Sequence, residues 1–535
     1  MISFRRIVKL SVAAAAAFII TGCAGNDAPL ASKGNMIPDN AIYAVKVNAD
    51  QFWNKALGDQ GSPGREMWQA AKSMASIYTS ELGEFGEVAR QILNDPAALG
   101  VNMKEPLVLT FAAEFSDYES YDMEGNVEVC LVALLDDSEA FLKIADAAVA
   151  VADAEAGVVV LKNVAQDFTH YEVEIEEDLT LDLGVTEESA VIRIKLDSAE
   201  EPLSLSDSML ALFAGEGPHD TDGIEAFYAS EADLAMWGDL DATLTMAMPV
   251  LEQEDPDSAA QLQAYLSMYE GSSFVSDLDF QDGRTVLNYS LYGSKELETY
   301  AKQYYAKPSA KFFEKLPASP FFAINVALKD CAGLVDEMSK LDAEFAELFT
   351  DLEEEYGFEK ELLEGFPGVI TFALSGDGLS DGTPVFGLMM DCEENVWEYA
   401  QEQLAEYADA DENGVYNIDD VVYVGYADGY MYAMDPETFH GQGSSSLADN
   451  AYADILAKGG LVVDLEALST ELLDDFAREI DYYLEGEDIL QYVSSIVVDP
   501  SDDLMSGTLV FNMGDKGHNL LEKLVLTAVD SAFQD

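Results

Sequence analysis

Basic residues are scarce in this chain of 535 residues. Only 27 are Lys or Arg, against 102 Asp or Glu, which gives a formal net charge of −75. Such a surface repels phosphate, so nucleic acid and anionic lipid headgroups are disfavoured as partners. High net charge predicts disorder only where apolar residues are few. Because 49% of the residues are hydrophobic, we expect a folded protein that carries its acidic residues at the surface.

Cysteine and histidine are also scarce, with four residues of each. No Cys-x-x-Cys or His-Glu-x-x-His spacing occurs, which leaves zinc and thioredoxin-type chemistry without support. Cys130 lies in an apolar run and is predicted to be a small buried residue. Cys331 and Cys392 each follow a predicted strand, and a disulfide between them is weighed against two free thiols. The histidines are predicted to be surface or capping residues: His170, His219, His440 and His518.

The N-terminal apolar run is short. Leu10–Ile20 has eleven residues, too few to cross a bilayer, and it follows three basic residues, as in an export signal. The next residues, Ile20-Thr21-Gly22-Cys23, resemble the bacterial lipobox, in which the cysteine is lipidated and becomes the new N-terminus. The resemblance implies a signal peptide over residues 1–22 and membrane attachment through a lipid on Cys23. An ordinary secretory signal is the alternative.

The chain repeats itself, and its length favours more than one domain. Four pairs of segments match in the same order: Ile37–Val47 with Leu316–Val326, Leu107–Ala112 with Gly368–Ala373, Met236–Leu240 with Leu461–Leu465, and Ser272–Val275 with Ser494–Val497. Each half reads as strands joined by short turns and interrupted by helices. This pattern predicts an α+β fold of two tandem related domains, each a mostly antiparallel sheet with packed helices.

The predicted domains are residues 36–305 and 316–535. Residues 23–35 are predicted to be a flexible tether, and residues 306–315 a linker. Three lysines of this linker could bind it to the acidic surface of the protein. The alternative is a solvated linker, which we favour. Local signals include a helix that starts at Ser62-Pro63 and a hairpin turn at Ala427-Asp428-Gly429.

The opening Ile37-Pro38-Asp39-Asn40-Ala41, the lipobox and the short polar tether together resemble a family of uncharacterised Bacteroidetes envelope lipoproteins, known as a domain of unknown function. The resemblance would cover residues 23–535. It implies an envelope lipoprotein and supplies no catalytic residues. Ala24, directly after the cysteine, resembles lipoproteins that are sent to the outer membrane.

One segment follows the spacing of an EF-hand calcium loop. Its oxygen ligands would be Asp409, Asp411, Asn413 and Asp420, with Gly414 at the sharp turn. Asp at the twelfth position is shorter than the usual Glu, and the matching part of the first half lacks these ligands. The alternative is a polar turn between a helix and a strand.

These observations predict a lipid-anchored acidic lipoprotein of the outer membrane with a binding or structural role and no catalytic residues. The sequence does not indicate whether the protein faces the periplasm or the cell surface, or which partner it binds. One alternative is an envelope hydrolase that acts on polysaccharide or peptide. Another is an adhesin that depends on calcium, the only cofactor that the sequence indicates.

Overall fold

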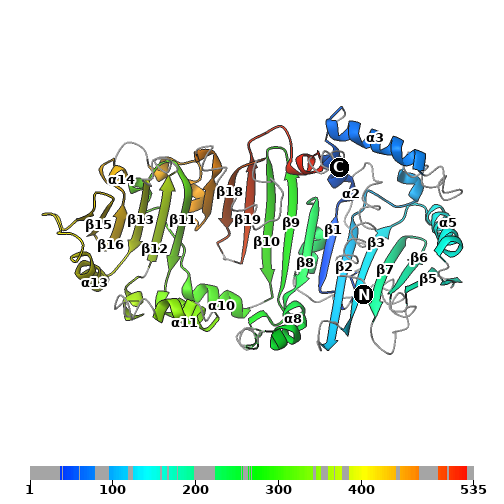
Figure 1. The fold of residues 1–535 in the computed structure, drawn as a ribbon, viewed down its shortest axis with the longest axis horizontal. Helices are drawn as coiled ribbons and strands as arrows, with labels where there is room; N and C mark the ends of the chain where they lie inside the picture. Colours follow the sequence, from blue (N-terminus) through cyan, green and yellow to red (C-terminus); the bar gives the residue numbers. More distant parts are fainter. Residues whose placement is uncertain are drawn as a thin grey trace. The chain divides into compact units, whose positions relative to one another are not determined.

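Figure 1 shows the computed structural model. The described residues are 37–38, 40–58, 61–78, 96–117, 124–156, 159–164, 168–176, 179–197, 223–254, 256, 259, 263, 266, 268–293, 295–341, 345–350, 360–366, 368–375, 385–441, 446–468, 492–502 and 505–526. The predicted signal peptide, Cys23 and the tether lie outside them. No helix of the described part has the length and apolar character needed to span a bilayer.

The fold class is α+β, as predicted. Every strand pairing of the described residues is antiparallel, and helices pack on the strands. Contacts divide the chain into two compact units. Unit 1 comprises residues 1–280, 291–293 and 518–535, and unit 2 comprises residues 281–290 and 294–517. This grouping differs from the predicted boundaries, because residues 295–305 belong to unit 2 and the C-terminal segment belongs to unit 1.

The sheet of unit 1 has the strand order β4-β5-β6-β7-β3-β2-β1-β8-β9. The strands are β1 (Tyr43–Val47), β2 (Leu107–Asp117), β3 (Glu124–Leu134), β4 (Val159–Val164), β5 (Thr169–Glu176), β6 (Leu179–Val185), β7 (Ser189–Asp197), β8 (Leu234–Asp239) and β9 (Ser273–Gln281). Side chains alternate between the two faces of each strand. In β3, Cys130 and Val132 lie in one core, while Leu131 and Ala133 lie in the other.

Helices cover the sheet of unit 1 on both faces, which explains the two cores. The helices are α2 (Ala49–Leu57), α3 (Pro63–Tyr78), α5 (Ser138–Ala156), α7 (Ile224–Ala229) and α8 (Leu240–Glu254), with a short 3₁₀ turn, η3 (Pro96–Leu99). Phe141 of α5 packs in one core and Phe227 of α7 in the other. The predicted start of α3 is confirmed, since Ser62 Oγ accepts a hydrogen bond from the Arg65 amide at 3.2 Å.

Unit 2 has the strand order β14-β15-β16-β13-β12-β11-β17-β18-β19-β10. The strands are β10 (Arg284–Tyr292), β11 (Pro320–Leu328), β12 (Gly368–Ser375), β13 (Val385–Asp391), β14 (Tyr416–Ile418), β15 (Val422–Ala427), β16 (Tyr430–Met434), β17 (Leu461–Asp464), β18 (Val493–Pro500) and β19 (Ser506–Met513). β10 pairs with β19 through its residues 284–290. The predicted hairpin between β15 and β16 is confirmed: Asp428 and Gly429 both have positive φ, at 52° and 82°.

The helices of unit 2 are α10 (Lys295–Tyr304), α11 (Cys331–Leu341), α13 (Glu394–Leu404), α14 (Pro436–His440) and α15 (Ala453–Leu456), with 3₁₀ turns η4 (Phe313–Lys315), η5 (Lys360–Gly365), η7 (Leu447–Asp449) and η8 (Leu465–Ala467). Phe312 and Phe313 lie in the core of this unit. Residues 306–315 are therefore built into unit 2 rather than forming the solvated linker that we favoured. Lys307 and Lys311 pair with Asp502 and Asp391.

Candidate functional site

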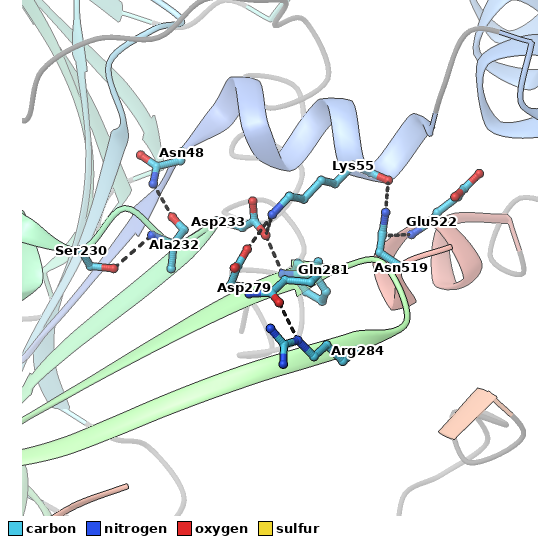
Figure 2. A network of polar contacts seen from close by, with 11 residues as sticks. Asn48, Lys55, Ser230, Ala232, Asp233, Asp279, Gln281, Arg284, Asn519 and Glu522 are labelled. Atoms are coloured by element: carbon cyan, nitrogen blue, oxygen red, sulfur yellow. Dashed lines mark hydrogen bonds and ion pairs between the residues drawn. The ribbon is translucent and has the colours of Figure 1, made fainter. Parts of the chain in front are cut away.

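One connected polar group of unit 1 surrounds Lys55, near the end of α2 (Figure 2). Its Nζ lies 2.8 Å from Oδ2 of Asp233 and 2.6 Å from Oδ1 of Asp279. The amide of Phe280 donates to the same Asp233 oxygen at 2.6 Å. The start of α2 is fixed at the same place, because the Asn48 amide donates to the backbone carbonyl of Asp233 at 2.9 Å. Both ends of α2 are thus tied to the start of β8.

Burial controls the electrostatics of this group. The Asp233 side chain is fully buried, whereas Lys55 and Asp279 are each 29% exposed. Burial raises the pKa of Asp233, although Lys55 and the Phe280 amide oppose the shift. Burial alone would lower the pKa of Lys55, but hydrogen bonds to the two carboxylates outweigh it and raise this pKa. One lysine therefore neutralises one of two carboxylates and holds α2 to β8 and β9.

The C-terminal segment of the chain adds to the same region. Nδ2 of Asn519 donates to the backbone carbonyl of Lys55 at 3.2 Å, and Oδ1 of Asn519 accepts from the Glu522 amide at 2.9 Å (Figure 2). The Glu522 carboxylate lies where a side chain at Gly58 would sit, which explains a glycine with positive φ at the end of α2. Residues 519–522 are buried there.

A second lysine of unit 1 is buried more deeply. Lys46 is 1% exposed and lies on the central strand β1. Its Nζ donates to the carbonyls of Phe227, Tyr228 and Ser230 at 2.6, 2.9 and 2.6 Å, where α7 ends. The ammonium thus satisfies carbonyls that have no partner within the helix. Burial lowers the pKa of Lys46 to about 8, against the opposing charges of Asp277 and Glu231.

A row of buried polar side chains crosses β3, β7, β6 and β5 on one face of the sheet. Nε2 of His170 lies 2.9 Å from Oδ1 of Asp182, and Nη2 of Arg193 lies 3.3 Å from Oδ2 of the same aspartate. Nη1 of Arg193 lies 3.6 Å from Oε2 of Glu128, whose other oxygen accepts from the Cys130 thiol at 3.3 Å. His170 is buried, so its predicted surface position is wrong, whereas His440 and His518 are exposed. His219 lies outside the described residues.

The charged side chains of this row pair with one another, and the Cys130 thiol lies at one end of the row. Burial raises the pKa of Cys130 well above its usual value, and the Glu128 charge adds to this shift. The thiol is therefore protonated at neutral pH, and a protonated thiol is a poor nucleophile. The sequence correctly predicted Cys130 as a buried small residue.

The segment with calcium-loop spacing folds as two hairpin turns. Oδ1 of Asp411 accepts from the amides of Asn413 and Val415, at 2.8 and 2.9 Å. The Val415 amide is the main cause of the lowered pKa of Asp411. Asp420 lies in the turn at the other end of β14 and accepts from Asn417 Nδ2 at 2.7 Å.

The four predicted calcium ligands are therefore not gathered around one point. Asp409, Asp411 and Asn413 precede β14, and Asp420 follows it. Within the described residues, no three His, Cys, Asp or Glu side chains are placed to hold a metal ion. The EF-hand requires a loop wrapped around the ion, whereas here Asp411 and Asp420 are hydrogen-bonded in two separate turns.

Cys331 and Cys392 are free thiols in the structure, in place of the weighed disulfide. Cys331 is the first residue of α11. Cys392 follows β13, where its thiol donates to the Glu393 carbonyl at 3.2 Å and packs against Trp397. Burial raises the pKa of Cys392 to about 11. The side chain thus fills a core position.

Comparisons with protein-family models, with curated proteins and with solved structures give no match to this chain.

Sequence patterns did not point to buried Lys46, to partly buried Lys55 or to the His170 row. Lys46 follows Ala44 on the face of β1 opposite Tyr43, Val45 and Val47, which looks like the solvent face of an amphipathic strand. The available signal was the apolar character of the segment 224–229, which must cover some surface once it forms α7. For Lys55 no local pattern exists, since its partners are 178 and 224 residues away.

Proposed function

We propose that this chain is an acidic lipoprotein of the outer membrane, held by a lipid on Cys23, with a binding or structural role. The observation that carries this proposal is Ile20-Thr21-Gly22-Cys23 directly after a short apolar run that follows basic residues. Several acyl chains on one cysteine, at about 0.8 kcal/mol per buried CH₂, would give stable attachment.

The buried ionisable groups support a role other than catalysis. Lys55 is occupied by Asp233 and Asp279, and Arg193 by Asp182 and Glu128. These contacts join strands and helices, so the groups serve the fold. Catalytic acids and bases, by contrast, need a pKa near the working pH and access to substrate.

We further propose that the two units are related domains. The strand order β9-β8-β1-β2-β3-β7-β6-β5 of unit 1 matches β18-β17-β11-β12-β13-β16-β15-β14 of unit 2. The register agrees with the sequence repeat: Trp237 lies opposite Val275, and Val462 lies opposite Val497. Two independent arrangements would rarely share both order and register.

A buried polar residue occupies the equivalent place on each central strand. In the sequence repeat, Lys46 of β1 matches Asn325 of β11. Nδ2 of Asn325 donates to the carbonyl of Leu456, the last residue of α15, at 2.8 Å. Lys46 does the same for α7. A shared way of holding a short helix on the central strand supports a common origin.

Fractionation of cells tests the attachment. The full chain is expressed in a bacterium that lipidates its envelope proteins, together with Cys23→Ser and, as a matched control, Cys331→Ser. We expect the parent and the control to stay with the outer membrane through carbonate washing and to incorporate labelled palmitate. Cys23→Ser should become soluble and unlabelled. If Cys23→Ser remains in the washed membranes, the proposal is wrong.

A further inference from the structure

Positive charge is missing from a long part of unit 2. Residues 361–457 contain 20 Asp or Glu and no Lys or Arg, and His440 is the one histidine. This stretch builds β12 to β16, together with α13, α14 and α15. Among the described ion pairs, only Lys311 brings a cation to a carboxylate of the stretch, that of Asp391. The potential over these elements is therefore strongly negative, beyond what the composition of the whole chain requires.

Stacked aromatic rings lie in the middle of this negative region. The rings of Tyr423 and Phe439 are parallel, with their centroids 4.5 Å apart and an angle of 2° between them. Phe439 in turn lies 6.2 Å from Tyr432, at 23°. Tyr432 crosses Gly425, where no side chain would fit. All three rings belong to half-buried residues.

Polar and charged groups surround the Tyr423 ring. Nε2 of His440 and Nδ2 of Asn417 each lie 3.4 Å from its hydroxyl. Asn417 also holds the carboxylate of Asp420, and the neighbouring Asp419 is exposed. We call this set the Tyr423 surface, and its members are Asn417, Asp419, Asp420, Tyr423, Phe439 and His440.

Two lysines of unit 2 contact aromatic rings elsewhere in this unit. Nζ of Lys315 lies 4.4 Å from the centre of the Tyr430 ring and also contacts its hydroxyl. Nζ of Lys311 lies 4.6 Å from the Phe312 ring and pairs with Asp391. Each lysine thus combines a ring face with an oxygen, the pairing in which cation–π and charge attraction add. The Tyr423 surface offers a ring and carboxylates with no lysine or arginine of the described residues paired to them.

We propose that the Tyr423 surface binds a lysine- or arginine-bearing segment of a partner protein. A cationic side chain would lie over the Tyr423 ring and pair with the carboxylates of Asp419 and Asp420. The two aspartates are adjacent and exposed in one turn, and both have positive φ, at 51° and 57°. A bound cation would relieve their repulsion. This inference deepens the proposed binding role and rests on it, but not on the lipid attachment.

Peptide binding tests the proposal with the mature full chain in an uncharged detergent. The probe is a fluorescent peptide of alternating lysine and glycine, with a glutamate–glycine peptide as its reference, titrated by anisotropy at about 0.02 and 0.2 M salt. The test variant is Asp419→Asn/Asp420→Asn, because asparagine tolerates positive φ and keeps the turn. The matched control is Glu187→Gln/Glu188→Gln, which removes the same charge from two exposed adjacent residues in a hairpin turn of unit 1.

We expect the Asp419→Asn/Asp420→Asn variant to bind the lysine peptide about fivefold more weakly than the parent, since two exposed ion pairs are lost. Tyr423→Leu should weaken binding about threefold, through loss of the cation–π contact. The control should bind like the parent. Equal weakening in the control and the test variant would mean general attraction to an acidic protein, and would overturn the proposal, as would absence of binding. Membrane attachment of Cys23 would stand in either case.

Discussion

At the residue scale, two of the scarce basic residues of this chain each hold several groups of unit 1 together. Lys46 and Lys55 each hold several partners in unit 1, and both lie far in sequence from the groups that they hold. A buried carboxylate without its cation costs several kcal/mol, because neither water nor another donor replaces the partner. The stability of unit 1 should therefore respond strongly to single lysine substitutions.

Lys55→Met leaves Asp233 buried without its cation. We expect the free energy of unfolding at pH 7 to fall by about 2 kcal/mol, below the range for fully buried pairs because Lys55 is partly exposed. Adding Asp233→Asn should restore much of the loss, since the amide oxygen still accepts from Phe280 and carries no charge. Urea denaturation of the three proteins measures this. A double variant as unstable as Lys55→Met would contradict it.

The lowered pKa of Lys46 predicts how the free energy of unfolding changes with pH. Its pKa is about 8 in the folded protein and roughly 10.4 in an unfolded chain. Between these pH values the unfolded state binds more protons than the folded state, so Lys46 makes the free energy of unfolding rise with pH. Below pH 8 Lys46 is charged in both states, and the full cost of burying this charge lowers the stability of the folded state. Lys46→Met should lose this rise, which amounts to about 3 kcal/mol at most over the window.

Denaturation of the parent and of Lys46→Met from pH 7 to 10 measures the difference, in which the other titrating groups cancel. Asn325→Leu is the matched control, because it removes the equivalent polar residue of unit 2 and no titratable group. The control should keep the slope of the parent. Parallel curves for the parent and Lys46→Met would show that the pKa of Lys46 is not lowered.

At the element scale, local patterns predicted the start of α3 and the hairpin between β15 and β16. The Asp428-Gly429 turn follows from its turn residues, and the start of α3 follows from its serine cap. The calcium loop was predicted from spacing alone. Spacing does not include the strand β14, which forms because Tyr416 is buried against Trp397. Burial of an aromatic ring thus decided the structure of this segment.

The cap of α3 gives a prediction at this scale. Ser62→Ala removes the acceptor of the Arg65 amide and should destabilise unit 1 by about 1 kcal/mol. Ser73→Ala, in the same helix, is the matched control: Ser73 is an interior residue whose hydroxyl bonds back to the Gln69 carbonyl, so alanine should raise helix stability slightly. Urea midpoints compare the two. Equal losses would mean that Ser62 does not act as a cap.

At the scale of the whole molecule, the repeat divides the chain into two halves whose limits differ from those of the two compact units. The sequence places the last helix in the second half, because it matches the helix that closes the first. In the structure, residues 518–526 belong to unit 1. The contact between Asn519 and Lys55 joins residues 464 positions apart, and no periodic pattern encodes such a pairing.

Truncation after Gly517 should therefore weaken unit 1 and spare unit 2. The deletion removes Leu520 and Leu521, both buried, and the bond from Asn519 to α2. Burial of two leucines contributes about 3 kcal/mol or more, so α2 should open more often. Hydrogen exchange should show lost protection in α2 and unchanged protection in β12 and β13. Loss of protection in β12 and β13 with α2 intact would place the segment in unit 2, as the repeat alone predicts.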